Sequence, residues 1–302
     1  SIVEKVAHYE SVHQVRTLND LKNRLSSSRR CFIYTHSTMP FEPLVILHIA
    51  LTNTINSNIA SLIKIPNNEK LDDTLDKREF TNAIFYSINS CQKGLREVDL
   101  GNSLIKSCVK LLLNEMPNLK LFHTLSPIPK FKEWLDLQLH LKSESSLKFD
   151  EMLSNDELSV LKNHFKLTET SQLIDAIKAY LNSSDFSSRM EAAKSHLSTN
   201  LNDPTQNAIS NFLLRSCAFY LYRVKKNGHA FNSVCNFHIK NGAQIFRINF
   251  GADLSDNGLK SSYGMMVNYG YYLDELDQNC ISYLSEKKIR ISNHVEELLK
   301  GV

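Results

Sequence analysis

The apolar run at residues 43–52 (PLVILHIALT) most constrains how this chain can fold. It is shorter than the roughly 18 residues that a membrane-spanning helix needs, and it contains His48. A short apolar run next to proline is typical of a buried strand. The run therefore predicts a strand in the core, and no membrane partner is expected.

The composition supports a globular chain with a substantial core. Of the 302 residues, 42% are hydrophobic and 22% are charged, with only nine glycines and seven prolines. These values exclude disordered, collagen-like and low-complexity classes. The 35 basic and 32 acidic residues are scattered and nearly balanced, so the net charge of +3 does not indicate a nucleic-acid surface. No nucleic-acid partner is expected.

Cysteine and histidine spacing gives no sign of a metal site. The six cysteines form no CxxC pair, the eleven histidines are dispersed, and no HExxH motif is present. The sequence therefore predicts no bound metal and reduced thiols in a reducing compartment. Because the chain begins at Ser1 rather than methionine, we expect it to be processed or cut from a longer polypeptide.

Strand and helix patterns alternate in the first half of the chain. A helical lead-in contains residues 20–25, and residues 101–114 form an amphipathic helix. A short helix is expected from Phe131 onward, after the stiff Ser-Pro-Ile-Pro loop. The expected strands cover residues 30–36, 43–52, 83–88 and 119–125.

The pattern changes to helix-length segments at about residues 143–224, which we interpret as a helical insertion. Asn241-Gly242 lies between two alternating runs and predicts a β-hairpin over residues 234–250. A strand at 265–272 and one charged helix from Asp277 to Leu299 follow. The expected class is therefore α+β, a mixed sheet with flanking helices, and not a doubly wound sheet.

The loop at residues 91–102 (CQKGLREVDLGN) joins an expected strand to an expected helix. Free N–H groups at such a helix start favour phosphate binding. The spacing of Arg96, Asp99 and Gly101 is similar to the loop that cradles a coenzyme A pyrophosphate in GNAT-type acyltransferases. An ordinary connection between a strand and a helix is the competing interpretation.

Three polar residues are further candidates for chemistry. His238 is expected on the first strand of the hairpin, where an imidazole is either a general acid or an ordinary surface or hydrogen-bonded residue. Ser126 ends an expected parallel strand, a position at which side chains commonly face ligands, although such a residue is more often an ordinary turn serine. His36 similarly ends a strand, and a loop histidine is usually solvated.

Taken together, these stretches resemble the malonyl-CoA decarboxylase family, from about Tyr9 to near the C-terminus. The helical insertion matches least well. The landmarks are Arg29-Arg30-Cys31-Phe32 with His36, Glu42-Pro43-Leu44-Val45-Ile46-Leu47-His48, Ala83-Ile84-Phe85-Tyr86-Ser87-Ile88, Gly94-Leu95 before Leu100-Gly101, Leu125-Ser126-Pro127-Ile128-Pro129, Asn236-Phe237-His238 with Asn241-Gly242-Ala243, and Asn268-Tyr269 with Tyr271.

The resemblance implies a GNAT-like domain that converts malonyl-CoA to acetyl-CoA and carbon dioxide, with no metal, biotin or other cofactor. It implies that His238 is the proton donor and Ser126 the proton acceptor. Asp99 and Tyr271 would support their geometry, and His36 would be needed for activity. The malonyl-CoA contacts would come from Ser126, His238 and the loop residues Arg96, Glu97, Val98, Asp99, Leu100, Gly101 and Asn102. Glu97 departs from the glycine that is usual there.

The resemblance also implies an upstream helical domain that forms a homo-oligomer, a tetramer, with residues 1–14 as its exit and residues 15–302 as the catalytic domain. Cys31 matches a position linked to interchain disulfides, although a buried thiol is the alternative. The expected compartment is the mitochondrial matrix, with peroxisome and cytoplasm as alternatives. Two other functions stay open, an acyl-CoA N-acyltransferase and a non-catalytic acyl-CoA sensor.

Overall fold

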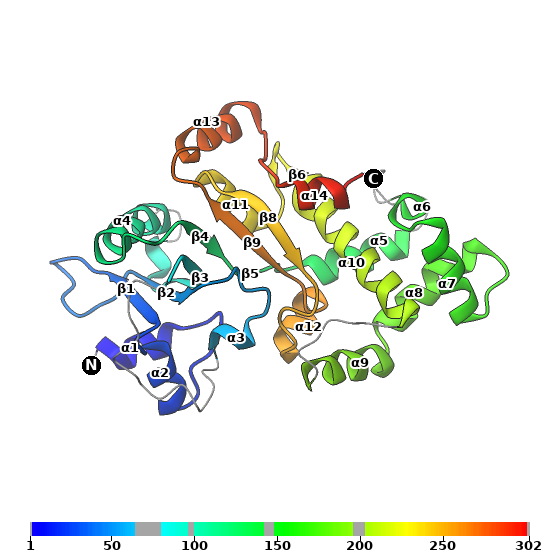
Figure 1. Ribbon diagram of the computed structural model, residues 1–302, viewed down its shortest axis with the longest axis horizontal. Coiled ribbons are helices and arrows are strands. Elements are labelled where there is room, and N and C mark those ends of the chain that lie inside the picture. The colour runs from blue at the N-terminus through cyan, green and yellow to red at the C-terminus, as the bar shows by residue number, and fades with distance from the viewer. Residues whose placement is uncertain (1, 64–79, 96–99, 142–147, 196–202, 301–302) are drawn as a thin grey trace. The chain divides into compact units, whose positions relative to one another are not determined.

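The computed structural model describes residues 2–63, 80–95, 100–141, 148–195 and 203–300 (Figure 1). The chain divides into two compact units. The first comprises Ser1–Ser126 and Tyr269–Leu276, and the second comprises Pro127–Asn268 and Asp277–Val302.

The first unit is built on a mixed sheet whose strands follow the order β1, β2, β3, β4 and β9. Strands β3 and β4 are parallel, whereas the other neighbouring pairs are antiparallel. Seven of the eight residues of β2 are buried, which confirms the core strand predicted from the apolar run. The bounds are β1 Arg29–Tyr34, β2 Val45–Thr52, β3 Asn82–Ser90, β4 Leu121–Thr124 and β9 Met266–Tyr271.

Helices flank this sheet, and α4 packs against β2. Helix α2 begins where its sequence allows, because the Thr17 side chain accepts a hydrogen bond from the Asp20 N–H while the Asp20 carboxylate accepts from the Thr17 N–H. The helices of this unit are α1 Ile2–Tyr9, α2 Leu18–Arg24, α3 Ala60–Ile63, the 3-10 turn Lys93–Leu95 and α4 Leu100–Glu115. The predicted sequence of strand, loop and helix is therefore confirmed.

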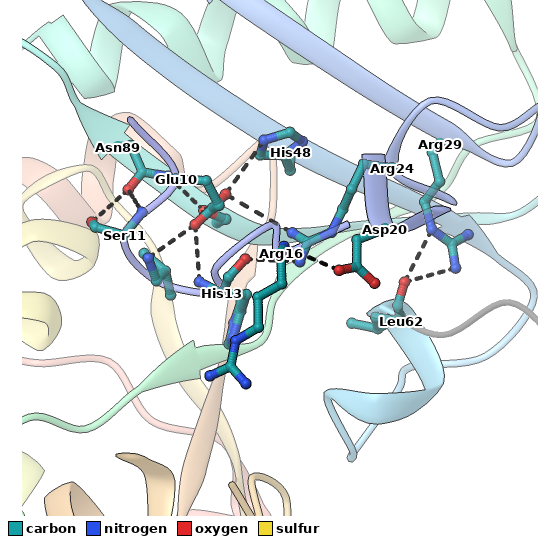
Figure 2. A network of polar contacts seen from close by, with 12 residues as sticks. Glu10, Ser11, His13, Arg16, Asp20, Arg24, Arg29, His48, Leu62 and Asn89 are labelled. Atoms are coloured by element: carbon teal, nitrogen blue, oxygen red, sulfur yellow. Dashed lines mark hydrogen bonds and ion pairs between the residues drawn. The ribbon is translucent and has the colours of Figure 1, made fainter. Parts of the chain in front are cut away.

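A buried polar cluster ties the N-terminal segment to the sheet (Figure 2). The Glu10 carboxylate accepts hydrogen bonds from the backbone N–H groups of Val12 and His13, at 2.9 Å each, and from the Ser87 hydroxyl of β3. The Arg24 guanidinium donates to the carbonyl of His13 at 2.8 Å. Glu10 and Arg24 are both almost wholly excluded from solvent. The segment that precedes the first strand is thus part of the core.

The second unit is mostly helical. Its central helix α10 begins at Pro204, where the Asp203 side chain accepts from the Thr205 N–H, and most of its residues are buried. The rings of Trp134 and Tyr220 pack 5.0 Å apart between α5 and α10. The helices up to this point are α5 Phe131–Leu141, α6 Phe149–Met152, α7 Asn155–Phe165, the 3-10 turn Thr170–Gln172, α8 Leu173–Leu181, α9 Ser184–Ser195 and α10 Pro204–Tyr222. They confirm the helical character predicted for the middle of the chain.

Shorter elements complete the chain. Strand β8 pairs with β9, and β6 pairs with β7 in a small antiparallel ribbon. Helices α11, α10 and α14 pack against β8. The bounds are β5 Ser126–Pro127, β6 Lys225–Lys226, β7 His229–Ala230, α11 Ser233–Lys240, β8 Gln244–Asn249, α12 Asp256–Ser262, α13 Leu276–Glu286 and α14 Asn293–Leu298.

The prediction of a hairpin over residues 234–250 is wrong in its first half, because residues 233–240 form helix α11. Asn232 begins this helix, since its side chain accepts from the Cys235 N–H at 2.9 Å. Gly242 adopts φ +82° after the last turn, and the Ala243 N–H reaches back to the His238 carbonyl. Asn-Gly suits a helix end as well as a hairpin turn, because both need a residue with positive φ. Only the second predicted strand exists, as β8.

The single C-terminal helix predicted to reach Leu299 is also wrong, because two helices occupy that region. Helix α13 ends at Glu286, and Lys287 follows in the left-handed conformation with φ +60°. Ile291 then forms a parallel bridge with Ile245 of β8 before Ser292 begins α14. Local periodicity favours one continuous helix over this region, but pairing of Ile291 with β8 separates it into two.

The predicted class, an α+β fold with a mixed sheet and flanking helices, is confirmed. Among the described residues, no helix combines the length and apolar character required to cross a membrane.

Candidate functional site

Ser126 follows the predicted parallel strand, β4, which ends at Thr124, and it begins the two-residue strand β5. Strand β4 pairs in parallel with β3, and the Leu125 N–H continues that pairing by donating to the Phe85 carbonyl at 3.1 Å. The Ser126 side chain is buried, and its hydroxyl donates to Thr124 Oγ1 at 2.9 Å. The hydroxyl groups of Thr124 and Ser126 therefore face each other. Ser126 is thus a buried strand residue, which does not fit the turn-serine interpretation.

Tyr271 lies on β9, beside β4, and is also buried. Its ring packs edge to face on that of Phe85, with centroids 6.2 Å apart. The neighbouring Gly270 is required by packing. A Cβ there would meet the Tyr272 ring at 2.9 Å and His123 Nε2 at 3.3 Å. The first unit therefore holds Ser126 and Tyr271 on neighbouring segments of one sheet.

His238 lies in the last turn of α11, in the second unit, and is 3% exposed. Burial lowers its pKa to about 3, so the imidazole is neutral near pH 7. Two hydrogen bonds of the Asn232 side chain hold this helix in place. Its side-chain oxygen accepts from the Cys235 N–H, and its amide donates to the Pro129 carbonyl at 2.9 Å. The helix that carries His238 is thereby fastened to the Ser-Pro-Ile-Pro loop, and the surface interpretation of His238 is wrong.

His36 is exposed in the turn after β1. Its Nδ1 accepts a hydrogen bond from the Thr38 N–H at 3.2 Å and lies 2.7 Å from the Thr38 hydroxyl. These contacts hold the ring against its own turn, as the solvated-loop interpretation expected. They do not link His36 to the hydroxyl pair at Ser126.

The candidate coenzyme A loop lies only partly within the described residues. Arg96, Glu97, Val98 and Asp99 lie outside the described residues. Leu100, Gly101 and Asn102 form the first turn of α4, so the predicted helix start at the end of this loop is confirmed. Its role in phosphate binding stays a prediction.

The cysteines of the chain are all free thiols in the structure. Burial raises the pKa of Cys31 to about 12, with a smaller contribution from the charge of Glu10. A thiol with so high a pKa is a poor nucleophile. Within the described ranges, no group of three or more His, Cys, Asp or Glu side chains could hold a metal ion.

The sequence patterns did not single out Thr124, which contacts Ser126, or Asn232, which begins the helix of His238. Thr124 could have been found from strand alternation, because it stands two residues before Ser126. Asn232 could have been found as a helix N-cap nine residues before Asn241, but the hairpin prediction placed that segment in a strand.

The fold and these positions define a mixed-sheet α+β protein with buried polar side chains at a strand end and on a short helix. Over residues 1–302 the chain matches the family described as "Malonyl-CoA decarboxylase C-terminal domain". The chain therefore belongs to the malonyl-CoA decarboxylase family, as its sequence landmarks implied.

Individual relatives agree with this assignment. The chain is 40% identical over 294 residues to the protein named "Malonyl-CoA decarboxylase, mitochondrial" of Anser anser anser, covering 97% of this chain and 54% of that one. It is 38% identical over 299 residues to the protein of the same name from Rattus norvegicus, covering 99% and 56%. The chain thus spans about half the length of these relatives.

Solved structures show the same fold. The crystal structure of malonyl-CoA decarboxylase from Rhodopseudomonas palustris superposes with a TM-score of 0.74 at 29% identity, covering 98% of this chain and 59% of that one. The corresponding structure from Cupriavidus metallidurans gives a TM-score of 0.73 at 32% identity, covering 99% and 64%.

Proposed function

We propose that this chain is the catalytic part of a malonyl-CoA decarboxylase, which converts malonyl-CoA to acetyl-CoA and carbon dioxide. The observation that carries the proposal is the 40% identity, over 97% of the chain, to a protein named for this activity. The buried Ser126 and His238 are compatible with it, because the reaction needs hydrogen-bonding groups shielded from water.

The chemistry defines what the side chains must do. When the bond between the carboxylate carbon and the α-carbon breaks, its electron pair forms a thioester enolate, and carbon dioxide leaves as a neutral molecule. The enzyme must stabilise the enolate oxygen and then deliver one proton to the α-carbon. Hydrogen-bond donors and a proton donor suffice for these steps, so we propose that no metal or other cofactor takes part.

We propose His238 as the proton donor. Its neutral imidazole in the free chain follows from burial, which lowers its pKa to about 3. A malonyl carboxylate bound beside it would favour the protonated form. The proton would then be taken up with the substrate and passed to carbon after carbon dioxide has left. This order gives the histidine a proton only when a substrate is present to use it.

We propose Ser126 as the proton acceptor that the family resemblance implies, with its hydroxyl hydrogen-bonded to the substrate carboxylate or carbonyl. Asp99 and Tyr271 would support the geometry of Ser126 and His238, and His36 would be needed for activity. Residues 96–102 would hold the pantetheine and pyrophosphate through backbone N–H groups at the start of α4.

We also propose a mitochondrial location, because the relatives from Anser anser anser and Rattus norvegicus carry that word in their names. The matrix is the proposed site, with peroxisome and cytoplasm as the alternatives. A homotetramer formed through an upstream helical domain is the proposed assembly. Fractionation of cells that express the natural protein tests the first point. Light scattering of this chain and of a longer one tests the second.

Carbon dioxide release and acetyl-CoA formation from malonyl-CoA test the function, with a metal chelator present. We expect chelator-resistant turnover by the wild-type chain that is lost in the His238→Ala variant. Turnover abolished by the chelator would overturn the cofactor-free mechanism. Acetyl transfer to an amine without decarboxylation would favour an N-acyltransferase. Tight malonyl-CoA binding without turnover, in this chain and in a longer one, would favour a sensor.

A further inference from the structure

The hydroxyl of Thr124 lies between the Ser126 side chain and the strand that carries Tyr271. Ser126 donates to Thr124 Oγ1 at 2.9 Å, and the backbone N–H of Tyr269 donates to the same oxygen at 3.1 Å. Thr124 and Tyr269 are fully buried, and Ser126 is 6% exposed. One threonine oxygen therefore joins the serine to β9.

The two donors occupy the acceptor capacity of the threonine. A hydroxyl oxygen has two lone pairs, and here one receives the Tyr269 N–H and the other receives the Ser126 O–H. The amide donor belongs to a paired strand and cannot rotate, so it fixes the position of the Thr124 oxygen. A serine hydroxyl otherwise turns freely to suit its surroundings. Both hydroxyl hydrogens can turn, so when a carboxylate or carbonyl oxygen is bound, Ser126 can donate to it while Thr124 donates to Ser126.

The main chain around the pair is anchored independently. Leu125, between the two hydroxyl residues, donates its N–H to the Phe85 carbonyl at 3.1 Å, and the Phe85 ring packs on Tyr271. The backbone thus holds the Cα of Ser126 in place without help from Thr124. What the threonine hydroxyl adds is the orientation of the serine hydroxyl.

We propose that Thr124 is a positioning residue for decarboxylation, holding the Ser126 oxygen where the serine hydroxyl can donate to the substrate. The inference rests on the proposed function and on the role of Ser126 within it. Thr124 acts through Ser126 and is not itself assigned a contact with the reacting atoms.

Four variants assayed for steady-state decarboxylation of malonyl-CoA test this role: Thr124→Val, Thr124→Ser, Ser126→Ala and the double variant Thr124→Val with Ser126→Ala. We expect Thr124→Val to lower kcat about tenfold, the effect of one lost hydrogen bond, and to change KM by less than about twofold. Thr124→Ser keeps the hydroxyl and should retain most of kcat. Adding Thr124→Val to Ser126→Ala should cost little more than Ser126→Ala alone.

The controls separate positioning from folding. Thr81→Val removes another hydroxyl of the same unit, one that donates to Asn82 at 3.3 Å, and should leave kcat unchanged. Circular dichroism and thermal unfolding show whether Thr124→Val folds. A full tenfold loss on top of Ser126→Ala would indicate a purely structural effect and overturn the inference, as would full kcat in Thr124→Val. Loss in Thr124→Val with full activity in Ser126→Ala would overturn the serine role and the inference together. Absence of turnover both in the wild-type chain and in a longer one would overturn the proposed function first.

Discussion

The Glu10 carboxylate lies 3.3 Å from His48 Nε2, and neither side chain is exposed to solvent. Burial tends to raise the pKa of Glu10, but hydrogen bonds from the His13 N–H, Ser87 and Asn89 hold it below its ordinary value. Burial lowers the pKa of His48 to about 4, against the attraction of Glu10. At neutral pH the pair is thus an ionised carboxylate beside a neutral imidazole. The positive charge that balances Glu10 is Arg24, whose Nη1 lies 3.9 Å away.

Glu10→Gln should destabilise the first unit by about 3 to 5 kcal/mol. The substitution keeps the shape of the side chain but leaves the buried Arg24 charge uncompensated. Urea unfolding followed by circular dichroism measures the loss. Glu42→Gln is the matched control, because Glu42 pairs with Lys5 where both side chains are partly exposed, and an exposed pair contributes little. Equal effects of the two variants would contradict a special role for the buried carboxylate.

Acid should destabilise the chain partly through His238. Its folded pKa of about 3 lies below the value of 6.5 expected for the unfolded chain, so unfolding takes up about one proton on this residue near pH 5. The stability that the neutral imidazole contributes is fully present well above pH 6.5 and is lost as the pH falls toward 3. The free energy of unfolding should fall by on the order of 2 kcal/mol between pH 7.5 and 5 through this residue. The free energy of unfolding of wild type and His238→Ala at pH 7.5 and 5 measures it. Subtracting the difference at pH 7.5 removes the cost of the cavity. Equal pH dependence in the two chains would contradict the buried neutral histidine.

Ser126→Ala and His238→Ala should each lower kcat about 10²-fold or more, the scale of one general acid or one polar transition-state contact. Malonyl-CoA binding, measured by calorimetry, should change much less, because neither residue is assigned to the coenzyme A moiety. Ser233→Ala is the control for α11, since this exposed residue lies in the first turn of the helix that carries His238. Near-full activity in Ser126→Ala or in His238→Ala would refute the role given to that residue.

Gly270→Ala should destabilise the first unit by about 1 to 3 kcal/mol, because the added methyl group would overlap the Tyr272 ring and crowd His123. Gly94→Ala is the matched control, since a Cβ there meets nothing within 4 Å. Its effect should stay within about 0.5 kcal/mol. Thermal unfolding of the two variants, side by side with wild type, measures both, and an unaffected Gly270→Ala would show that β9 can shift to make room.

Prediction from sequence succeeded where the signal lies within a few neighbouring residues. The apolar run became β2, the strand before Ser126 became β4, and the amphipathic segment after the candidate loop became α4. It failed at residues 233–240. Burial of Cys235, His238 and Ile239 there follows helical spacing, but Asn241-Gly242 favoured a hairpin. The local signal at Asn-Gly is compatible with both structures, and only packing against β8 and capping by Asn232 select the helix.

The sequence by itself determined the secondary structure of most segments, the α+β class and the family, because strand and helix periodicity and the ordered landmarks are local properties. The tertiary structure decided which polar groups meet. Glu10 reaches Ser87 across 77 residues, and Thr124 reaches the Tyr269 N–H across 145. Such contacts form only after the sheet has assembled and its loops have closed, so no local pattern encodes them. Burial of His238 has the same origin, because the packing of α11 removes its imidazole from water and thereby keeps it neutral.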